Sequence, residues 1–158
     1  MKYKFDNNHV IQSSFKAEDY FPAIVMFSSE ELNNRFIEYS YEDTDMFEIV
    51  ASSDTGVIKQ FTLTLCNHFL VHDTDIDNPV TTDGIMYFDK SESIQCDSFL
   101  VNIFHDGIRV DVSEKKAKTF LKCGQLVFAF DEADSLSSLY VLNLSEDDIK
   151  HILSEINQ

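Results

Sequence analysis

The sequence has little of what builds a nucleotide-binding loop or a disulfide framework. It contains only four glycines, and neither a GxGxxG nor a GxxxxGK[ST] pattern occurs, so a loop that cradles phosphates is not expected. Its cysteines, Cys66, Cys96 and Cys123, are odd in number and far apart, and no CxxC pair is present. We therefore expect reduced thiols and a cytosolic protein, not a disulfide-stabilised secreted one.

Long apolar runs are also missing. No run approaches the roughly 18 residues that a membrane span needs. The start, MKYKFDNNHV, has no continuous apolar stretch after its lysines, so a secretory signal is not expected. The 158 residues suit a single globular domain, residues 1–158, and 14 Phe and 6 Tyr without any Trp predict an aromatic-rich core. These features predict a soluble, cytoplasmic protein.

Basic residues are scarce. Twelve Lys and Arg face 28 Asp and Glu, which gives a net charge of −16, and four of the lysines crowd into residues 115–122. Because phosphate binding needs basic patches, nucleic acid and anionic membranes are not expected as partners. A protein with a basic surface is the favoured partner, since opposite charge speeds association. A purely solubilising role for the acids stays open as the alternative.

Several segments alternate apolar and polar residues with the period of a β-strand. Residues 57–66, VIKQFTLTLC, show it most clearly, and IMYFD, SFLVNIF, IRVDV, LVFAF and LYVLN have the same character. Asp106-Gly107 stands between two apolar runs and predicts a hairpin whose glycine takes a positive φ. Residues 131–138, DEADSLSS, predict a second, longer hairpin connection.

Helical patterns occur at three places. Residues 28–39, SSEELNNRFIEY, begin with serines that can cap a helix and repeat apolar residues at helical spacing. Residues 145–156, SEDDIKHILSEI, combine a capping serine with one apolar stripe. Residues 113–124, SEKKAKTFLKCG, favour a short helix ended by a glycine. The predicted class is α+β: a mostly antiparallel sheet with an N-terminal, a middle and a C-terminal helix.

Acidic residues gather in the predicted connections between strands. Exposed carboxylates on one face would form a negative patch that attracts a cationic surface. We therefore predict that the following acids bind the partner: Glu42, Asp43, Asp45, Asp73, Asp75, Asp77, Asp131, Glu132 and Asp134.

One of these stretches, residues 72–84 (HDTDIDNPVTTDG), has the alternating aspartates of a calcium loop. Asp73, Asp75 and Asp77 fit the first, third and fifth positions of an EF-hand. The twelfth position, which needs a bidentate glutamate, is Gly84, and the flanking segments have strand character, not helical character. A solvated connection between two strands explains the stretch better.

No pattern in the chain predicts catalysis, a metal or a cofactor. His68 and His72 are four residues apart, which suits zinc only on a helix and only with further ligands. Cys123 lies beside Lys122, whose charge could favour a reactive thiolate. We expect Cys123 instead to be a small apolar residue that packs at the end of a helix. DTG (residues 54–56) and DEAD (residues 131–134) lack the context of a protease or a helicase and read as turns.

The general profile resembles bacterial immunity proteins, in particular those of contact-dependent growth inhibition systems. The resemblance rests on the acidic stretches YEDTDMFE and HDTDIDN, the strand-rich middle and the segment SEDDIKHILSEI. It implies a non-enzymatic protein that binds and blocks a cognate, basic toxin domain, such as a nuclease, by covering its active site. Exposed aromatics, with Tyr41 and Tyr87 as candidates, would anchor the complex.

Two other functions stay open at this point. An acidic protein can imitate DNA and bind several DNA-binding proteins, whereas an immunity protein selects one partner. A metal-dependent hydrolase would assemble its ligands from scattered residues. Capture of binding partners distinguishes a DNA mimic, which would bind several proteins, from an immunity protein, which would bind one. A metal ion found in the purified protein would favour the hydrolase.

Overall fold

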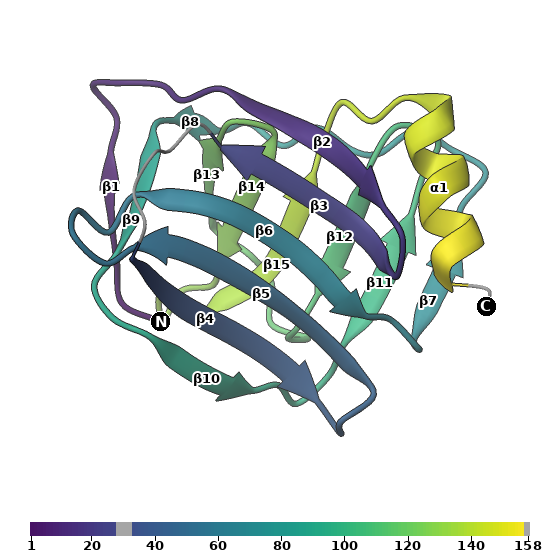
Figure 1. Ribbon diagram of the computed structural model, residues 1–158, viewed down its shortest axis with the longest axis horizontal. Coiled ribbons are helices and arrows are strands. Elements are labelled where there is room, and N and C mark those ends of the chain that lie inside the picture. The colour runs from purple at the N-terminus through teal and green to yellow at the C-terminus, as the bar shows by residue number, and fades with distance from the viewer. Residues whose placement is uncertain (28–32, 157–158) are drawn as a thin grey trace.

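The computed structural model describes residues 1–27 and 33–156, and its elements form a β-sandwich (Figure 1). A six-stranded sheet lies in front in this view, and a seven-stranded sheet lies behind it with its strands crossing those of the first. The described residues contain 15 strands and one helix. The first sheet has the order β10 (Glu92–Gln95), β4 (Asn34–Tyr41), β5 (Asp45–Ser52), β6 (Ile58–Leu65), β3 (Phe21–Phe27) and β2 (Ser13–Glu18).

The second sheet completes the sandwich. Its edges, β7 and β8, pair in parallel with β11 and β13, whereas the strands between them are antiparallel. A separate antiparallel pair joins β1 (Tyr3–Asp6) to β9 (Ile85–Phe88). The second sheet has the order β7 (Phe69–Val71), β11 (Leu100–Ile103), β12 (Ile108–Asp111), β15 (Leu136–Val141), β14 (Leu126–Phe130), β13 (Thr119–Cys123) and β8 (Thr82–Asp83).

The core lies between the two sheets because alternate residues of each strand point inward. In the first sheet, Ile49 pairs across the strands with Ile37 on one side and Phe61 on the other, and all three are buried. In the second sheet, the inward row includes Val110 and its neighbour Leu139. Fully buried aromatic rings confirm the predicted aromatic-rich core.

Two elements close the open sides of the sandwich. The β1–β9 pair lies at the left in Figure 1, where the ring of Tyr3 stacks on Phe130 with 4.4 Å between centroids. The helix α1 (Glu146–Ile156) lies at the right, packs on β3 and β2, and buries Ile149 and Ile152. None of the described helical segments is long and apolar enough to cross a membrane.

The predicted α+β class is wrong, because two of the three predicted helices are not helices. The predicted N-terminal helix covers residues 28–39, of which 28–32 lie outside the described residues. From Asn34 the chain is strand β4, which pairs with all eight residues of β5. Ile37 and Tyr39 are buried and their neighbours are more exposed, so burial with a period of two overrides the helical spacing of the aromatic residues.

The predicted middle helix over residues 113–124 is wrong as well. Its second half is strand β13, which pairs with β14 and buries Leu121 and Cys123 on the inward face. Gly124 does end the element, but as the tip of a β-hairpin with a φ of 59°. A Cβ at Gly124 would lie 2.5 Å from the Ser13 hydroxyl oxygen, so this turn requires glycine.

Two local predictions are confirmed, and a third is confirmed in its position but not in its backbone conformation. The C-terminal helix begins with a reciprocal cap: Asp148 N–H donates to Ser145 Oγ, and Ser145 N–H donates to Asp148 Oδ2. The hairpin predicted at residues 131–138 joins β14 to β15, which pair antiparallel, but its connection is residues 131–135, because β15 begins at Leu136. Asp106-Gly107 does join β11 to β12, but Gly107 has no positive φ. Gly107 is needed instead for close approach, because a Cβ there would lie 2.7 Å from the Val141 carbonyl oxygen.

Candidate functional site

The nine predicted partner-binding acids lie on three different connections. Glu42 and Asp43 belong to the turn between β4 and β5, and Asp45 is the first residue of β5. Asp73, Asp75 and Asp77 lie in the connection of residues 72–81, called here the crossing loop, which leads from β7 at one edge of the second sheet to β8 at the other. The remaining three belong to the β14–β15 connection.

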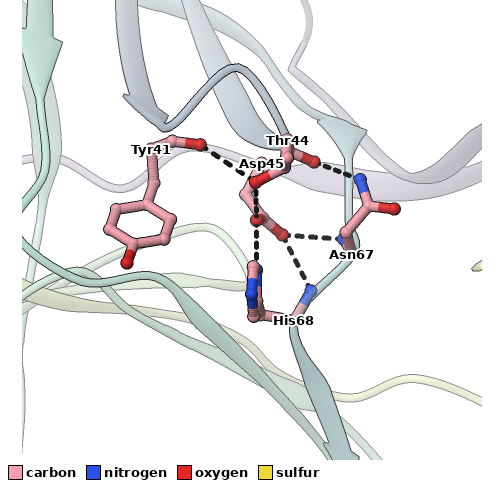
Figure 2. Close-up of polar contacts among 5 residues, drawn as sticks. All are labelled: Tyr41, Thr44, Asp45, Asn67 and His68. Atoms are coloured by element: carbon pink, nitrogen blue, oxygen red, sulfur yellow. Dashed lines mark hydrogen bonds and ion pairs between the residues drawn. The ribbon is translucent and has the colours of Figure 1, made fainter.

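Asp45 is fully buried and organises the first of these connections (Figure 2). Its Oδ1 accepts the backbone N–H groups of Asn67 at 2.7 Å and His68 at 3.0 Å. Its Oδ2 accepts the Thr44 hydroxyl at 2.8 Å and lies 2.6 Å from His68 Nδ1. The carboxylate thereby ties the β4–β5 turn to the connection between β6 and β7.

These bonds decide the charge and the role of Asp45. Burial by itself raises the pKa of this carboxyl, but the hydrogen bonds from His68, Asn67 and Thr44 outweigh burial and hold the pKa below its usual value. The side chain is therefore ionised and satisfied inside the protein. Asp45 offers no surface to a partner, so we leave it out of the proposed binding surface. The sequence pattern of clustered acids cannot distinguish such a buried acid from its exposed neighbours.

The turn that Asp45 holds carries two exposed acids in an unusual backbone conformation. Glu42 has a φ of 48° and Asp43 a φ of 57°, and Thr44 N–H donates to the Tyr41 carbonyl oxygen at 3.0 Å. Two consecutive positive φ values define a type I′ turn, for which Asn-Gly is preferred. Acidic residues there strain the backbone, and such strain is a reason to suspect function.

Exposed apolar side chains lie next to this turn. Leu65 ends β6 with 44% of its surface exposed, and Leu70 and Val71 in β7 are exposed by 52% and 60%. Among the described strands, β7 is an edge strand and pairs with β11 alone. In Figure 1 the β4–β5 turn lies at the bottom and β7 at the right, and the bonds of Asp45 to Asn67 and His68 link the turn to the residues just before β7. Sequence reasoning missed these residues because their burial depends on the strand order.

The crossing loop carries the second acidic group, at the far end of β7. Asp73 Oδ1 lies 3.0 Å from His105 Nε2, and Asp75 Oδ1 lies 3.5 Å from His105 Nδ1. Ile76, which follows Asp75, is buried, and its N–H donates to Asp106 Oδ1 at 2.8 Å. The loop is therefore anchored to the β11–β12 hairpin through its own apolar residue, while its aspartates stay exposed.

We define the corner surface as the exposed acids of the β4–β5 turn, the first two aspartates of the crossing loop and the exposed apolar residues of β6 and β7, so that Asp77 lies outside it. Asp73 follows His68, which lies beside the turn, by five residue steps, and an extended chain of five steps spans about 17 Å. Both acidic groups therefore fit beneath one interface of standard size, about 800 Å² per partner. The corner surface comprises Glu42, Asp43, Leu65, Leu70, Val71, Asp73 and Asp75.

The third acidic group is separate and partly neutralised. Asp131 is 6% exposed, and its Oδ1 accepts the backbone N–H groups of Ala133 and Ser135 within its own connection. Glu132 lies 2.8 Å from Lys118 Nζ, and Asp134 accepts the hydroxyl of Tyr3 at 2.6 Å. Asp134 thus holds the N-terminal strand through Tyr3, and Glu132 neutralises one of the clustered lysines. We leave these acids out of the corner surface.

The histidine and cysteine candidates do not form a chemical centre. His68 is bound to Asp45, whereas His72 stacks on Phe104 and its Nε2 lies 2.8 Å from Asn102 Oδ1. Burial raises the pKa of the Cys123 thiol to about 11, so the reactive thiolate is disfavoured. Within residues 1–27 and 33–156, no cluster of three His, Cys, Asp or Glu side chains suits a metal ion.

A comparison with protein-family models found no match, and a comparison with curated proteins found none either.

Proposed function

We propose that this chain is an inhibitor of the immunity type, which binds one basic toxin domain in the cytoplasm and covers its active site. The observation that carries the proposal is the corner surface, where exposed apolar side chains lie between two groups of exposed acids. Glu42 and Asp43 form no ion pair with any of the residues that the structure describes. Their charge is available for a partner.

This arrangement has the anatomy of a protein–protein interface. Interfaces bury an apolar centre inside a polar rim that remains accessible to water. Leu70, whose neighbour Asn102 places it on the outer face of the sheet, would supply the apolar centre, and the acids at the two ends of β7 would supply the rim. Val71 projects to the opposite face and would contact the partner only at the sheet edge. Tyr41, predicted as an aromatic anchor, packs edge-on against His68 with 5.7 Å between ring centroids, so its ring is already positioned.

The charge of the protein supports a basic partner. The net charge of −16 is spread over about 8,300 Å² of accessible surface. A surface with such a charge attracts a cationic protein over about one Debye length, which is ~8 Å at physiological salt. Attraction of this kind raises the association rate and excludes partners of like charge.

Inhibition by this surface needs no reaction and no cofactor. The turn that carries Glu42 and Asp43 is held by a buried, fully bonded carboxylate, so the protein does not have to order it on binding. A pre-ordered surface loses less entropy in the complex and binds more tightly. Steric cover of the toxin's active site then excludes its substrate.

Affinity capture tests this proposal. The protein is immobilised and exposed to a lysate of its own cells at about 50 mM salt, followed by elution at about 500 mM, where surface charges are screened within ~5 Å. We expect one basic protein, whose enzymatic activity falls when the inhibitor is added back. Recovery of several DNA-binding proteins would support DNA mimicry instead. Binding that is unaffected by salt would contradict the electrostatic part of the proposal.

A further inference from the structure

A polar network lies on the outer face of the second sheet, on the side away from the core. The register places Asn102, Arg109 and Tyr140 in one row across β11, β12 and β15, and Asp111 and Ser138 in the next row. Asn102 and Ser138 are buried, at 3% and 8% exposure. Polar side chains on a sheet face that is open to water are normally exposed, so their burial here is unusual.

The network fixes the guanidinium of Arg109. Arg109 Nε donates to Asp111 Oδ1 at 2.9 Å, and Nη2 donates to Oδ2 at 3.1 Å. Asp111 is held in turn by Ser138 Oγ at 2.6 Å and Asn102 Nδ2 at 2.8 Å. The Arg109 guanidinium also lies over the ring of Phe104, 5.7 Å from its centroid. Four bonds satisfy the carboxylate of Asp111, whereas Arg109 keeps N–H donors to spare.

This network forms the floor of a groove of about 540 Å³. The groove has apolar walls formed by Leu100, Ala117 and Phe120. Its lining also includes Lys115 and Lys116, which belong to the loop before β13. A volume of this size lies in the range of small-molecule sites, which combine apolar walls with a few fixed polar groups. The groove is separate from the corner surface defined above.

The charge of the groove is opposite to that of the protein. Its lining contains three cations, Arg109, Lys115 and Lys116, against two acids, Asp111 and Glu114, so the lining has a formal charge of +1 in a chain of −16. One further acid, Asp77, acts on the lining residue Tyr140 from outside the groove. Lys115 and Lys116 form no ion pair with the residues that the structure describes. Asp111 is already compensated by Arg109 and its other donors. The groove therefore favours an anion.

We propose that this groove binds a small amphipathic carboxylate. The carboxylate head would be held by the fixed guanidinium of Arg109 and by Lys115 and Lys116, because planar carboxylates match the donors of a guanidinium. The apolar body would lie against Leu100 and Phe120. The site does not depend on the inhibitor function, and its test requires only the isolated protein.

Titration followed by amide NMR shifts tests the site with sodium octanoate as the probe, at about 150 mM salt so that long-range repulsion is screened. Acetate is a control that has the carboxylate but no long alkyl chain, and octylammonium is a control that has the alkyl chain but a positive charge. We expect saturable shifts for octanoate at β12, β15 and residues 113–120. Octanoate binding should be at least ~10-fold tighter than that of either control, since several buried CH₂ groups contribute.

Two variants locate the binding. Arg109→Lys keeps the charge but loses paired donors, and Lys115→Gln with Lys116→Gln removes two exposed cations without touching the core. Each should weaken octanoate binding about tenfold, whereas the matched pair Lys16→Gln with Lys150→Gln should change it by less than about twofold. Absence of saturable octanoate shifts, equal binding of octylammonium, equal binding of acetate, or unchanged affinity in both groove variants would each overturn the proposal.

Discussion

Replacement of Asp45 by alanine should destabilise the protein more than any other single change of an acidic residue in the predicted partner-binding set. The substitution leaves the backbone N–H groups of Asn67 and His68 without their acceptor and leaves a cavity in a fully buried position. Each buried polar group left unsatisfied costs about 1–3 kcal/mol. We therefore expect a loss of about 3–5 kcal/mol of unfolding free energy, measured by urea titration.

Two comparisons make the Asp45 prediction specific. Asp45→Asn keeps the shape but loses the charge that His68 and Thr44 contact, so about 1.5–3 kcal/mol should be lost. Asp43→Asn, at the exposed tip of the same turn, should stay within about 0.5 kcal/mol of the parent. An Asp45→Ala protein that unfolds within 0.5 kcal/mol of the parent would refute the role given to this carboxylate.

The pH dependence of the Asp45 contribution has a defined sign. The folded-state pKa lies below the usual value, so the unfolded chain binds the proton more readily. The stabilisation is then fully present above the unfolded pKa of about 3.9 and is lost as the pH falls through the folded pKa. The difference in stability between the parent and Asp45→Asn should therefore be constant above about pH 5 and shrink below about pH 4.

Three further outcomes are expected. Glu42→Asn combined with Asp43→Gly should stabilise the protein by about 1 kcal/mol in thermal unfolding, because Asn-Gly suits the type I′ turn; a loss of stability would contradict the assigned φ values. Gly124→Ala should cost about 2 kcal/mol or more in urea unfolding, since its φ is 59° and its Cβ position is occupied; a neutral effect would contradict this turn. Cys123, with its pKa raised to about 11, should react with iodoacetamide at pH 8 only as the protein unfolds, since ~1 thiol in 1,000 is ionised; rapid labelling of the folded protein would contradict its burial.

Local patterns predicted the strands well and the helices poorly. Residues 57–66 alternate, and the structure has strand β6 there, because a half-buried strand repeats every two residues whatever its partners are. The segments that became β4 and β13 have spacings that suit both a helix and a strand. Their partners, β5 and β14, supply the backbone hydrogen bonds and the burial that decide between the two, and such pairing is not visible locally.

The candidate site was predictable in composition and not in geometry. Clustered acids at Glu42 and Asp73 follow directly from the sequence. The sequence does not show that Asp45 is buried among Asn67 and His68, nor that β7 lies at a sheet edge. These facts depend on contacts between residues more than 20 positions apart and on strand order. For the same reason, the network that fixes Arg109 joins three strands and gives no local signal.

The central claim, that the corner surface binds a basic protein, is tested most directly by association rates with the captured partner. Neutralisation of four corner acids (Glu42→Gln, Asp43→Asn, Asp73→Asn and Asp75→Asn) should slow association about tenfold at ~50 mM salt. The matched control neutralises four exposed acids elsewhere that form no ion pair with the described residues: Asp54→Asn, Asp83→Asn, Asp89→Asn and Asp147→Asn. The control should change the rate by less than about threefold. Equal rates for the two variants would contradict the proposed surface.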